Sequence, residues 1–154
     1  MAPLIVMVVA WTLFRWIGFG GYFDQADSWS GALRFAFAAM FTFTAISHFH
    51  PRTRSDLIRM VPAGLPAPGL LVTATGVLEL IGAIGLLVPE TKAAAAYALS
   101  ALLAAMFPAN VRAARAGLVV AGRRATPLVW RLPLQLFWMA ALWWVARASP
   151  TISM

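Results

Sequence analysis

Cysteine is absent from this 154-residue sequence, and charged residues make up only 11% of it. The missing cysteine excludes disulfide bonds, thiolate metal sites and a thiol relay to quinone. A soluble domain of this length carries about 25% charged residues. Because hydrophobic residues reach 62% and the mean hydropathy is +0.81, the low charge indicates that water is not the main solvent of this chain.

The sequence also lacks a phosphate loop, a nucleophile elbow and a zinc signature. Its formal net charge of +7 raises the question of nucleic acid, but no continuous basic face adjoins an aromatic platform. The basic residues lie in short loops between apolar runs, where they fix topology and contact anionic headgroups. Membrane lipids are therefore the expected partners, and nucleic acid is not.

Five apolar runs approach the length of about 20 residues that a bilayer span requires. They predict an all-α membrane protein with a single transmembrane domain over residues 1–154 and spans at about 3–19, 31–49, 69–88, 91–107 and 127–146. The first run is predicted to be a retained helix, because no basic residue precedes it and no small-x-small cleavage site follows it. The fourth span is predicted to end at Phe107-Pro108-Ala109-Asn110.

The segment from Arg52 to Pro68 is too polar and too rich in proline to span a bilayer. We expect Ser55 to cap a short interfacial helix there, with apolar side chains in the lipid and arginines at the headgroups.

Five spans place successive loops on alternate faces, so the lysine and arginine count predicts orientation. The richer face carries Arg52, Arg54, Arg59, Arg112, Arg115, Arg123 and Arg124, and the other carries Arg15, Arg34, Lys92 and Arg147, diluted by Asp24, Asp27 and Glu90. The richer face should be cytoplasmic, which places the N-terminus inside and the C-terminus outside.

Glu79 is the most informative single residue, because it lies about eleven residues into the third span. At 1.5 Å per residue it is roughly 16 Å deep, near the bilayer midplane. An ionised carboxylate is costly there without a partner. Small residues flank it at spacings of three and four, namely Thr75, Gly76, Gly82 and Ala83. We therefore expect the acid to point into the bundle, where another helix approaches closely.

The predicted partner of Glu79 lies on the fifth span, where Arg131 and Gln135 share one helix face. Gln135 is roughly 12 Å deep by the same rise, close to the level of Glu79. Two interpretations are open: an inert polar clamp that fixes helix register, or a functional pocket for a quinone-like or lipid-like ligand or a proton.

His48 and Asn110 end the second and fourth spans at the predicted cytoplasmic side. His48 is expected to have an interfacial or hydrogen-bonding role, with ligand binding or proton handling as the alternative, and no metal site is expected because no cysteine or close acidic cluster completes one. Asn110 is predicted to terminate its helix or to join His48 and Arg131 in one cluster. Thr42, Thr44 and Ser47 are expected to bond back to their own helix or to pair across helices.

From Phe35 onward the sequence resembles the DoxX-like family of small bacterial membrane proteins, which are four-helix bundles. The matching stretches are Ser47-His48-Phe49 with Pro51, Met60-Val61-Pro62 with Leu65-Pro66 and Pro68, Thr75-Gly76-Val77-Leu78-Glu79-Leu80 with Gly82-Ala83 and Gly85-Leu86-Leu87, Phe107-Pro108-Ala109-Asn110-Val111, and Arg131-Leu132-Pro133-Leu134-Gln135. The first span is an addition to that pattern.

The resemblance implies a bacterial cytoplasmic membrane protein whose polar residues are His48, Glu79, Asn110, Arg131 and Gln135. Family members are linked to quinone-coupled oxidation of sulfur compounds and to membrane redox and oxidative-stress complexes, and related proteins act as assembly chaperones. Three functional hypotheses follow, in this order: a non-catalytic subunit that stabilises another membrane protein or a homo-oligomer, a quinone-binding subunit of an oxidoreductase, and a small transporter or proton pathway.

Overall fold

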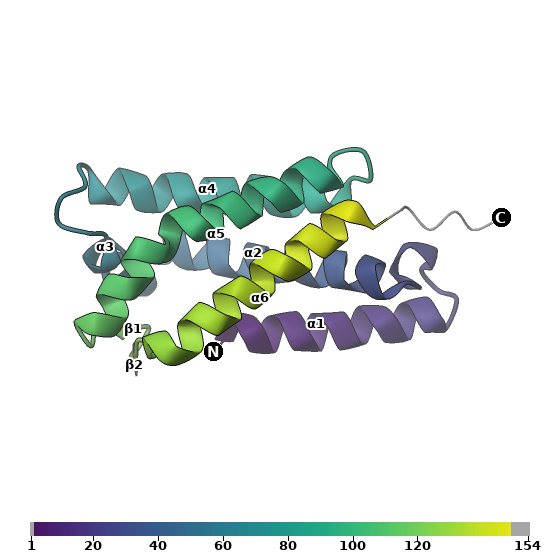
Figure 1. Ribbon diagram of the computed structural model, residues 1–154, viewed down its shortest axis with the longest axis horizontal. Helices are drawn as coiled ribbons and strands as arrows, with labels where there is room; N and C mark the ends of the chain where they lie inside the picture. The colour runs from purple at the N-terminus through teal and green to yellow at the C-terminus, as the bar shows by residue number, and fades with distance from the viewer. Residues whose placement is uncertain (1, 149–154) are drawn as a thin grey trace.

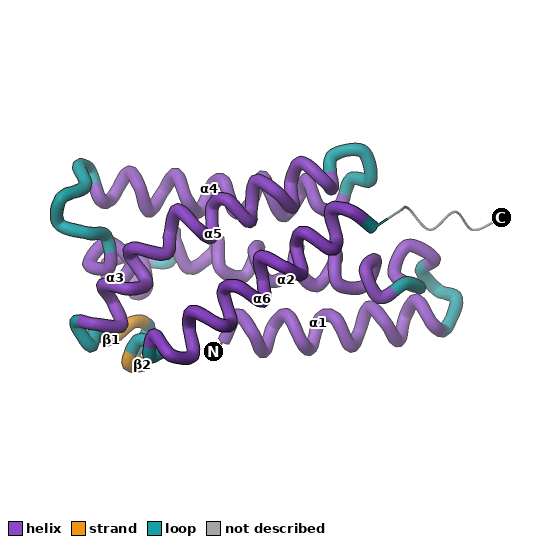
Figure 2. The backbone as a smooth tube through the Cα atoms, in the orientation of Figure 1, coloured by secondary structure: helices purple, strands orange, loops and turns teal. Residues whose placement is uncertain are grey.

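The computed structural model describes residues 2–148, and five of its helices are long and apolar enough to cross a membrane (Figures 1 and 2). These candidate spans are α1 (Ala2–Phe19), α2 (Trp29–Phe49), α4 (Pro68–Leu87), α5 (Lys92–Arg115) and α6 (Leu128–Arg147). The shorter elements are η1 (Asp24–Ala26), α3 (Pro51–Met60) and the strands β1 (Val119–Val120) and β2 (Arg123–Arg124). The predicted multi-pass, all-helical membrane protein is confirmed at this level.

Helix α2 lies at the centre of the bundle and packs against α1, α4 and α6, while α5 packs between α4 and α6. The core between these helices is built from apolar side chains such as Phe37, Phe41, Leu86, Leu99 and Leu142. Large apolar side chains also cover the outer faces, among them Ile81 on α4 and Leu136 on α6. A soluble protein does not tolerate so much exposed apolar surface, so these faces fit a hydrocarbon solvent.

Helix α1 packs along α2 and against η1 at one edge of the bundle. Only Met7 and Gly18 are buried among its eighteen residues. Gly18 is needed where α1 meets η1, because a Cβ there would lie 2.4 Å from the backbone of Ala26. The hydroxyl of Ser28 caps the next helix, accepting from the backbone N–H of Gly31 at 2.9 Å.

Helix α5 corrects the predicted end of the fourth span, because it continues past Pro108 to Arg115. Proline removes one backbone donor, which leaves the carbonyl of Ala104 without its usual helical partner. Inside a bundle of helices such a loss is tolerated, because neighbouring groups and small local adjustments satisfy the freed carbonyl. The same holds in α6, which accommodates Pro133 in its interior.

The segment after α2 does form a short helix, but its start differs from the prediction. Helix α3 begins at Pro51 with His50 as its N-cap, so Ser55 lies inside the helix and donates to the carbonyl of Arg52. Pro51 fits the first helical position because that position needs no N–H donor.

The β1–β2 hairpin was not predicted from the sequence. Its turn consists of Ala121 and Gly122, both at positive φ, and the register pairs Val119 with Arg124. The hairpin is tied to α3, because Asp56 accepts from the backbone N–H of Ala121 at 2.9 Å.

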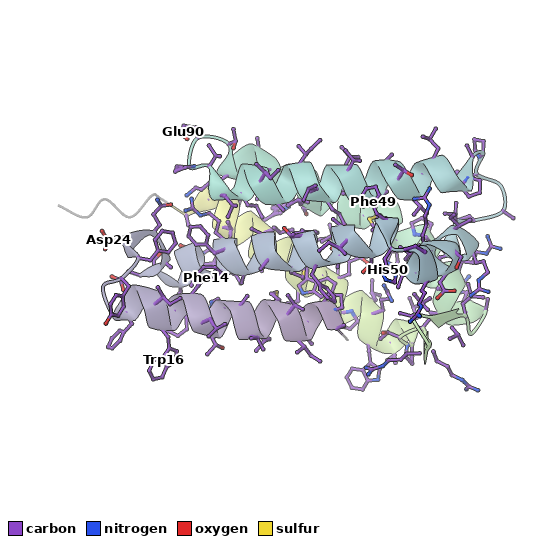
Figure 3. The ribbon with its side chains drawn as sticks, turned by 180° about the vertical axis from the view of Figure 1, so that it is seen from behind. Phe14, Trp16, Asp24, Phe49, His50 and Glu90 are labelled. Carbon is purple, nitrogen blue, oxygen red and sulfur yellow. The ribbon has the colours of Figure 1, made fainter. Side chains whose placement is uncertain are left out.

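The two ends of the bundle differ in charge as the loop alternation predicts. Helix α3, the hairpin and the start of α4 lie together at one end, while Glu90 and Asp24 lie at the other (Figures 1 and 3). Hydrogen bonds hold the arginine-rich end together, since Arg112 donates to the carbonyl of Val61 and Arg59 to that of Val119. The predicted grouping of basic residues at one end is therefore confirmed.

Candidate functional site

Glu79 is buried between α4 and α2, with 3% of its surface exposed. This confirms that the carboxyl points into the bundle. Its neighbour is His48 on α2, whose Nε2 lies 3.6 Å from Glu79 Oε2, and the imidazole is buried as well. The Thr44 side chain, one turn before His48, also lies beside the carboxyl. The site is therefore a His–Glu pair that joins two membrane-spanning helices.

The other ring nitrogen of His48 fixes the tautomer of the imidazole. Nδ1 lies 2.8 Å from the backbone carbonyl of Val72 and 3.1 Å from the hydroxyl of Thr75. A carbonyl oxygen can only accept, so Nδ1 carries a hydrogen. Thr75 donates its own proton to the backbone of α4 and is free to accept from the ring. Nε2 therefore faces Glu79 with either a lone pair or a second proton.

Glu79 Oε2 has no hydrogen-bond partner within the described residues. The separation of 3.6 Å from Nε2 exceeds the 2.7–3.2 Å that a hydrogen bond requires. A small rotation of either side chain would close the bond and place one proton between the two atoms. If the acid holds that proton the pair is neutral, and if the imidazole holds it the pair is ionic.

Glycine makes the close approach of α2 and α4 possible. A Cβ added to Gly76 would lie 2.6 Å from His48 Cβ and 3.0 Å from a ring carbon of Phe49. Gly82 performs the same role toward α5, because a Cβ there would lie 2.5 Å from a methyl group of Leu99. The predicted small-residue face of α4 is thus confirmed, and it contacts two helices.

Arg54 of α3 closes the end of this helix pair. Its guanidinium donates to the carbonyls of His48 and Gly69, both at 3.0 Å, and to the hydroxyl of Thr73 at 2.9 Å. These bonds tie α3 to the end of α2 and the start of α4. Arg54 was assigned only a headgroup contact from the sequence, so its role as a clamp is new.

The predicted pairing of Glu79 with Arg131 is wrong. Arg131 lies half-buried in the first turn of α6 and forms no ion pair with any acid in residues 2–148. Counting residues from the ends of the spans gave the wrong partner for Glu79, because the end of α2 and the start of α4 are not at the same level. His48, next to the end of α2, packs against Gly76, which lies eight residues inside α4. Glu79 therefore lies only about one helical turn inside the end of α2, level with the turn that contains Thr44.

Within residues 2–148, Gln135 and Asn110 make no hydrogen bond to His48 or Glu79. Gln135 is buried and its Nε2 donates to the carbonyl of Leu103 at 2.7 Å, which joins α6 to α5. Asn110 lies half-buried inside α5, where its side chain makes no hydrogen bond to the part of the chain described, so it does not terminate the helix. The predicted cluster of His48, Asn110 and Arg131 is not formed by hydrogen bonds.

Thr42, Thr44 and Ser47 each donate to a carbonyl of α2 itself, which confirms the predicted back-bonding. Within residues 2–148, no three histidine, aspartate or glutamate side chains come close enough to hold a metal ion.

An open groove of about 790 Å³ lies at the arginine-rich end between the α3–α4 loop and α5. Pro62, Phe107 and Arg112 line it, and neither member of the His48–Glu79 pair does.

A family model described as a domain of unknown function (DUF8561) matches residues 37–146 of this chain. The match covers more than half of the sequence. The chain belongs to this family. The DUF8561 region begins within α2 and ends near the end of α6, so it contains His48 and Glu79 and leaves α1 outside. Neither a curated protein nor a solved structure matches the chain.

Proposed function

We propose that this protein is a small integral membrane subunit without autonomous catalysis, which assembles with a membrane protein complex and stabilises it. One observation carries the proposal: two buried polar side chains of the bundle bond to backbone carbonyls across two different helix interfaces. His48 binds the carbonyl of Val72 between α2 and α4, and Gln135 binds that of Leu103 between α6 and α5. Such bonds fix the register of packed membrane helices.

The resemblance to the DoxX-like family supports a redox-linked complex in the bacterial cytoplasmic membrane. In this proposal the arginine-rich end faces the cytoplasm, the N-terminus is inside, and α3 lies at the membrane surface. The span ends agree with Trp130 near the proposed cytoplasmic boundary and with Trp16, Trp29, Trp143 and Trp144 near the outer one, since tryptophan favours both interfaces.

Helix α1 supplies the surface for assembly in this proposal. It lies outside the family region and exposes large apolar side chains at spacings of three and four, namely Ile5, Val9, Leu13 and Trp16. Trp16 points away from the bundle (Figure 3). An added helix with one free apolar face supports contact with a partner membrane protein or with a second copy of this chain.

Purification of the full chain in mild detergent tests the role as a subunit. We expect a second membrane protein, or a second copy, in fixed stoichiometry by size-exclusion chromatography and mass spectrometry. The variant Val9→Ala/Leu13→Ala should weaken that association, whereas Ile81→Ala/Ile84→Ala, which trims an equally exposed face of α4, should not. Elution of the wild type as a lone monomer would contradict the proposal.

A second candidate function, a quinone-binding subunit of an oxidoreductase, is favoured by the unbonded oxygen of Glu79. A quinone carbonyl accepts hydrogen bonds, and a protonated Glu79 or a doubly protonated His48 would donate one. In this reading the buried pair opens to admit the polar headgroup while the isoprenoid tail remains in lipid.

The amount of quinone bound to the purified protein distinguishes the assembly role from the quinone-binding role. The quinone-binding reading predicts a quinone in solvent extracts of the purified wild type and at least about a tenfold lower amount in Glu79→Gln. Glu90→Gln is the matched control, because Glu90 is exposed in the α4–α5 loop. Equal quinone in Glu79→Gln and wild type, or none in either, would reject the reading and leave the assembly role standing.

A further inference from the structure

Arg34 is a buried cation that has no negatively charged partner among the described residues. It lies in the second turn of α2, at the end of the bundle opposite α3, and only 7% of its surface is exposed. Its Nη2 donates to Gln25 Oε1 at 2.6 Å, and its guanidinium lies 4.6 Å from the centre of the Phe35 ring. Both contacts are with neutral groups, and Nε has no hydrogen-bond partner.

A second cation faces the same region. Lys92 is the first residue of α5, and it lies close enough to Arg34 for the two charges to repel each other. Its Nζ donates to the carbonyl of Ala148 at 2.6 Å, beyond the end of α6. Leu33 and Phe37, which flank Arg34, share one core cluster with Ala95 and Ala146. The start of α2, the start of α5 and the end of α6 lie at the same end of the bundle (Figure 1).

Within residues 2–148, no acidic side chain forms an ion pair with either cation. Asp27 lies 3.7 Å from Arg15 instead, Asp24 is exposed in η1, and Glu90 is exposed in the α4–α5 loop. The N-termini of α2 and α5 add the positive ends of two helix dipoles. A buried guanidinium without a counter-charge is costly. The described residues at this end therefore lack one negative charge to balance the buried guanidinium.

We propose that Arg34 and Lys92 bind one phosphate group, supplied by the headgroup of an anionic phospholipid at this surface of the membrane. The guanidinium plane provides paired N–H donors that match two phosphate oxygens, and Lys92 provides a compact charge. Arg34 lies about 9 Å along α2 from its capping residue, close enough to the helix end for its long side chain to extend toward the headgroups. The site is independent of the His48–Glu79 pair.

Native mass spectrometry of the full chain in detergent, titrated with phosphatidylglycerol and with phosphatidylcholine of the same acyl chains, tests the site. We expect the wild type to bind phosphatidylglycerol preferentially, and Arg34→Gln and Lys92→Gln each to bind it at least about fivefold more weakly. Arg124→Gln is the matched control, because it removes the same charge from an exposed position at the other end. If Arg34→Gln does not fold, the half-buried Lys92 still gives a result.

Three outcomes would overturn the proposal. Unchanged affinity in both Arg34→Gln and Lys92→Gln would show that these residues do not hold the lipid. An equal loss in Arg124→Gln would indicate attraction by net charge alone. Displacement of the lipid by excess inorganic phosphate would assign the site to free phosphate and reject the lipid as its source.

Discussion

His48 Nε2 lies 3.6 Å from Glu79 Oε2 across the contact of α2 with α4, with both side chains more than nine-tenths buried. An ionisable side chain in a membrane span is costly unless it faces another polar group. Each of these residues is therefore the polar environment of the other, and the pair should be energetically coupled.

A double-mutant cycle measures that coupling. His48→Leu and Glu79→Leu should each lower the free energy of unfolding by about 1–3 kcal/mol, because each leaves one buried polar group without its neighbour. The double variant should lose about 1 kcal/mol less than the sum of the single losses. Thermal and denaturant unfolding in detergent give the free energies. Strictly additive losses would contradict the pairing.

The corresponding cycle between Glu79 and Arg131 should show no coupling. The two residues form no ion pair, so Glu79→Leu and Arg131→Gln should be additive within about 0.5 kcal/mol. The same unfolding measurements apply. A coupling as large as that of His48 with Glu79 would restore the pairing that the sequence suggested.

Much of this fold is predictable because hydrocarbon imposes a simple rule on the sequence. A span needs a long apolar run with all its backbone bonds made internally, so the centres of all five runs matched the helices. The sequence did not predict the features that depend on tertiary contacts. Helix α5 continues through Pro108 to Arg115 in a bundle where it packs along α4 and α6, and the hairpin at Ala121-Gly122 is held by Asp56 of α3.

The sequence singled out three of the buried polar residues, His48, Glu79 and Gln135, but not their partners. It also missed the burial of Arg34 and Ser100. Burial of Glu79 follows from its position in an apolar run, whereas a partner depends on how two helices are staggered. Gly76 was the available signal, because a glycine one turn before the acid marks where another helix approaches closely. The proline-rich stretch before Pro68 prevents the offset between α2 and α4 from being predicted, because a loop of that composition has no fixed length per residue along the helix axes.

The stagger of α2 and α4 depends on Gly76, and a single methyl group should disturb it. Gly76→Ala places a Cβ 2.6 Å from His48 Cβ, so the helices must separate, at a cost of about 1–3 kcal/mol. Gly69→Ala on the same helix is the control, because its nearest atoms are 3.9 Å away. Unfolding in detergent should show a lower midpoint for Gly76→Ala only. Equal midpoints for the two variants would mean that α2 and α4 are not in close contact.

The absence of cysteine makes the proposed orientation easy to measure. Ala63→Cys in the α3–α4 loop and Glu90→Cys in the α4–α5 loop each introduce one exposed thiol at opposite ends. If the arginine-rich end is cytoplasmic, a membrane-impermeant maleimide should label Glu90→Cys in intact cells and Ala63→Cys only after permeabilisation. The reverse pattern would invert the proposed topology, and labelling of both in intact cells would argue against the span count.

The α5–α6 contact depends on hydrogen bonds that cross it, and Gln135 makes a buried one. Its amide donates to the carbonyl of Leu103 at 2.7 Å, and double-mutant cycles in membrane helices value such bonds at about 0.6 kcal/mol, with a maximum of about 1.7. Gln135→Leu should therefore lower the free energy of unfolding within that range. Thr12→Val is the control, because Thr12 bonds only to the carbonyl of Val8 within its own helix and is exposed, so its removal should leave the unfolding midpoint unchanged. If Gln135→Leu left the midpoint unchanged too, the amide would be a tolerated polar group and not a clamp, and the assembly role proposed from such cross-helix bonds would lose its main support.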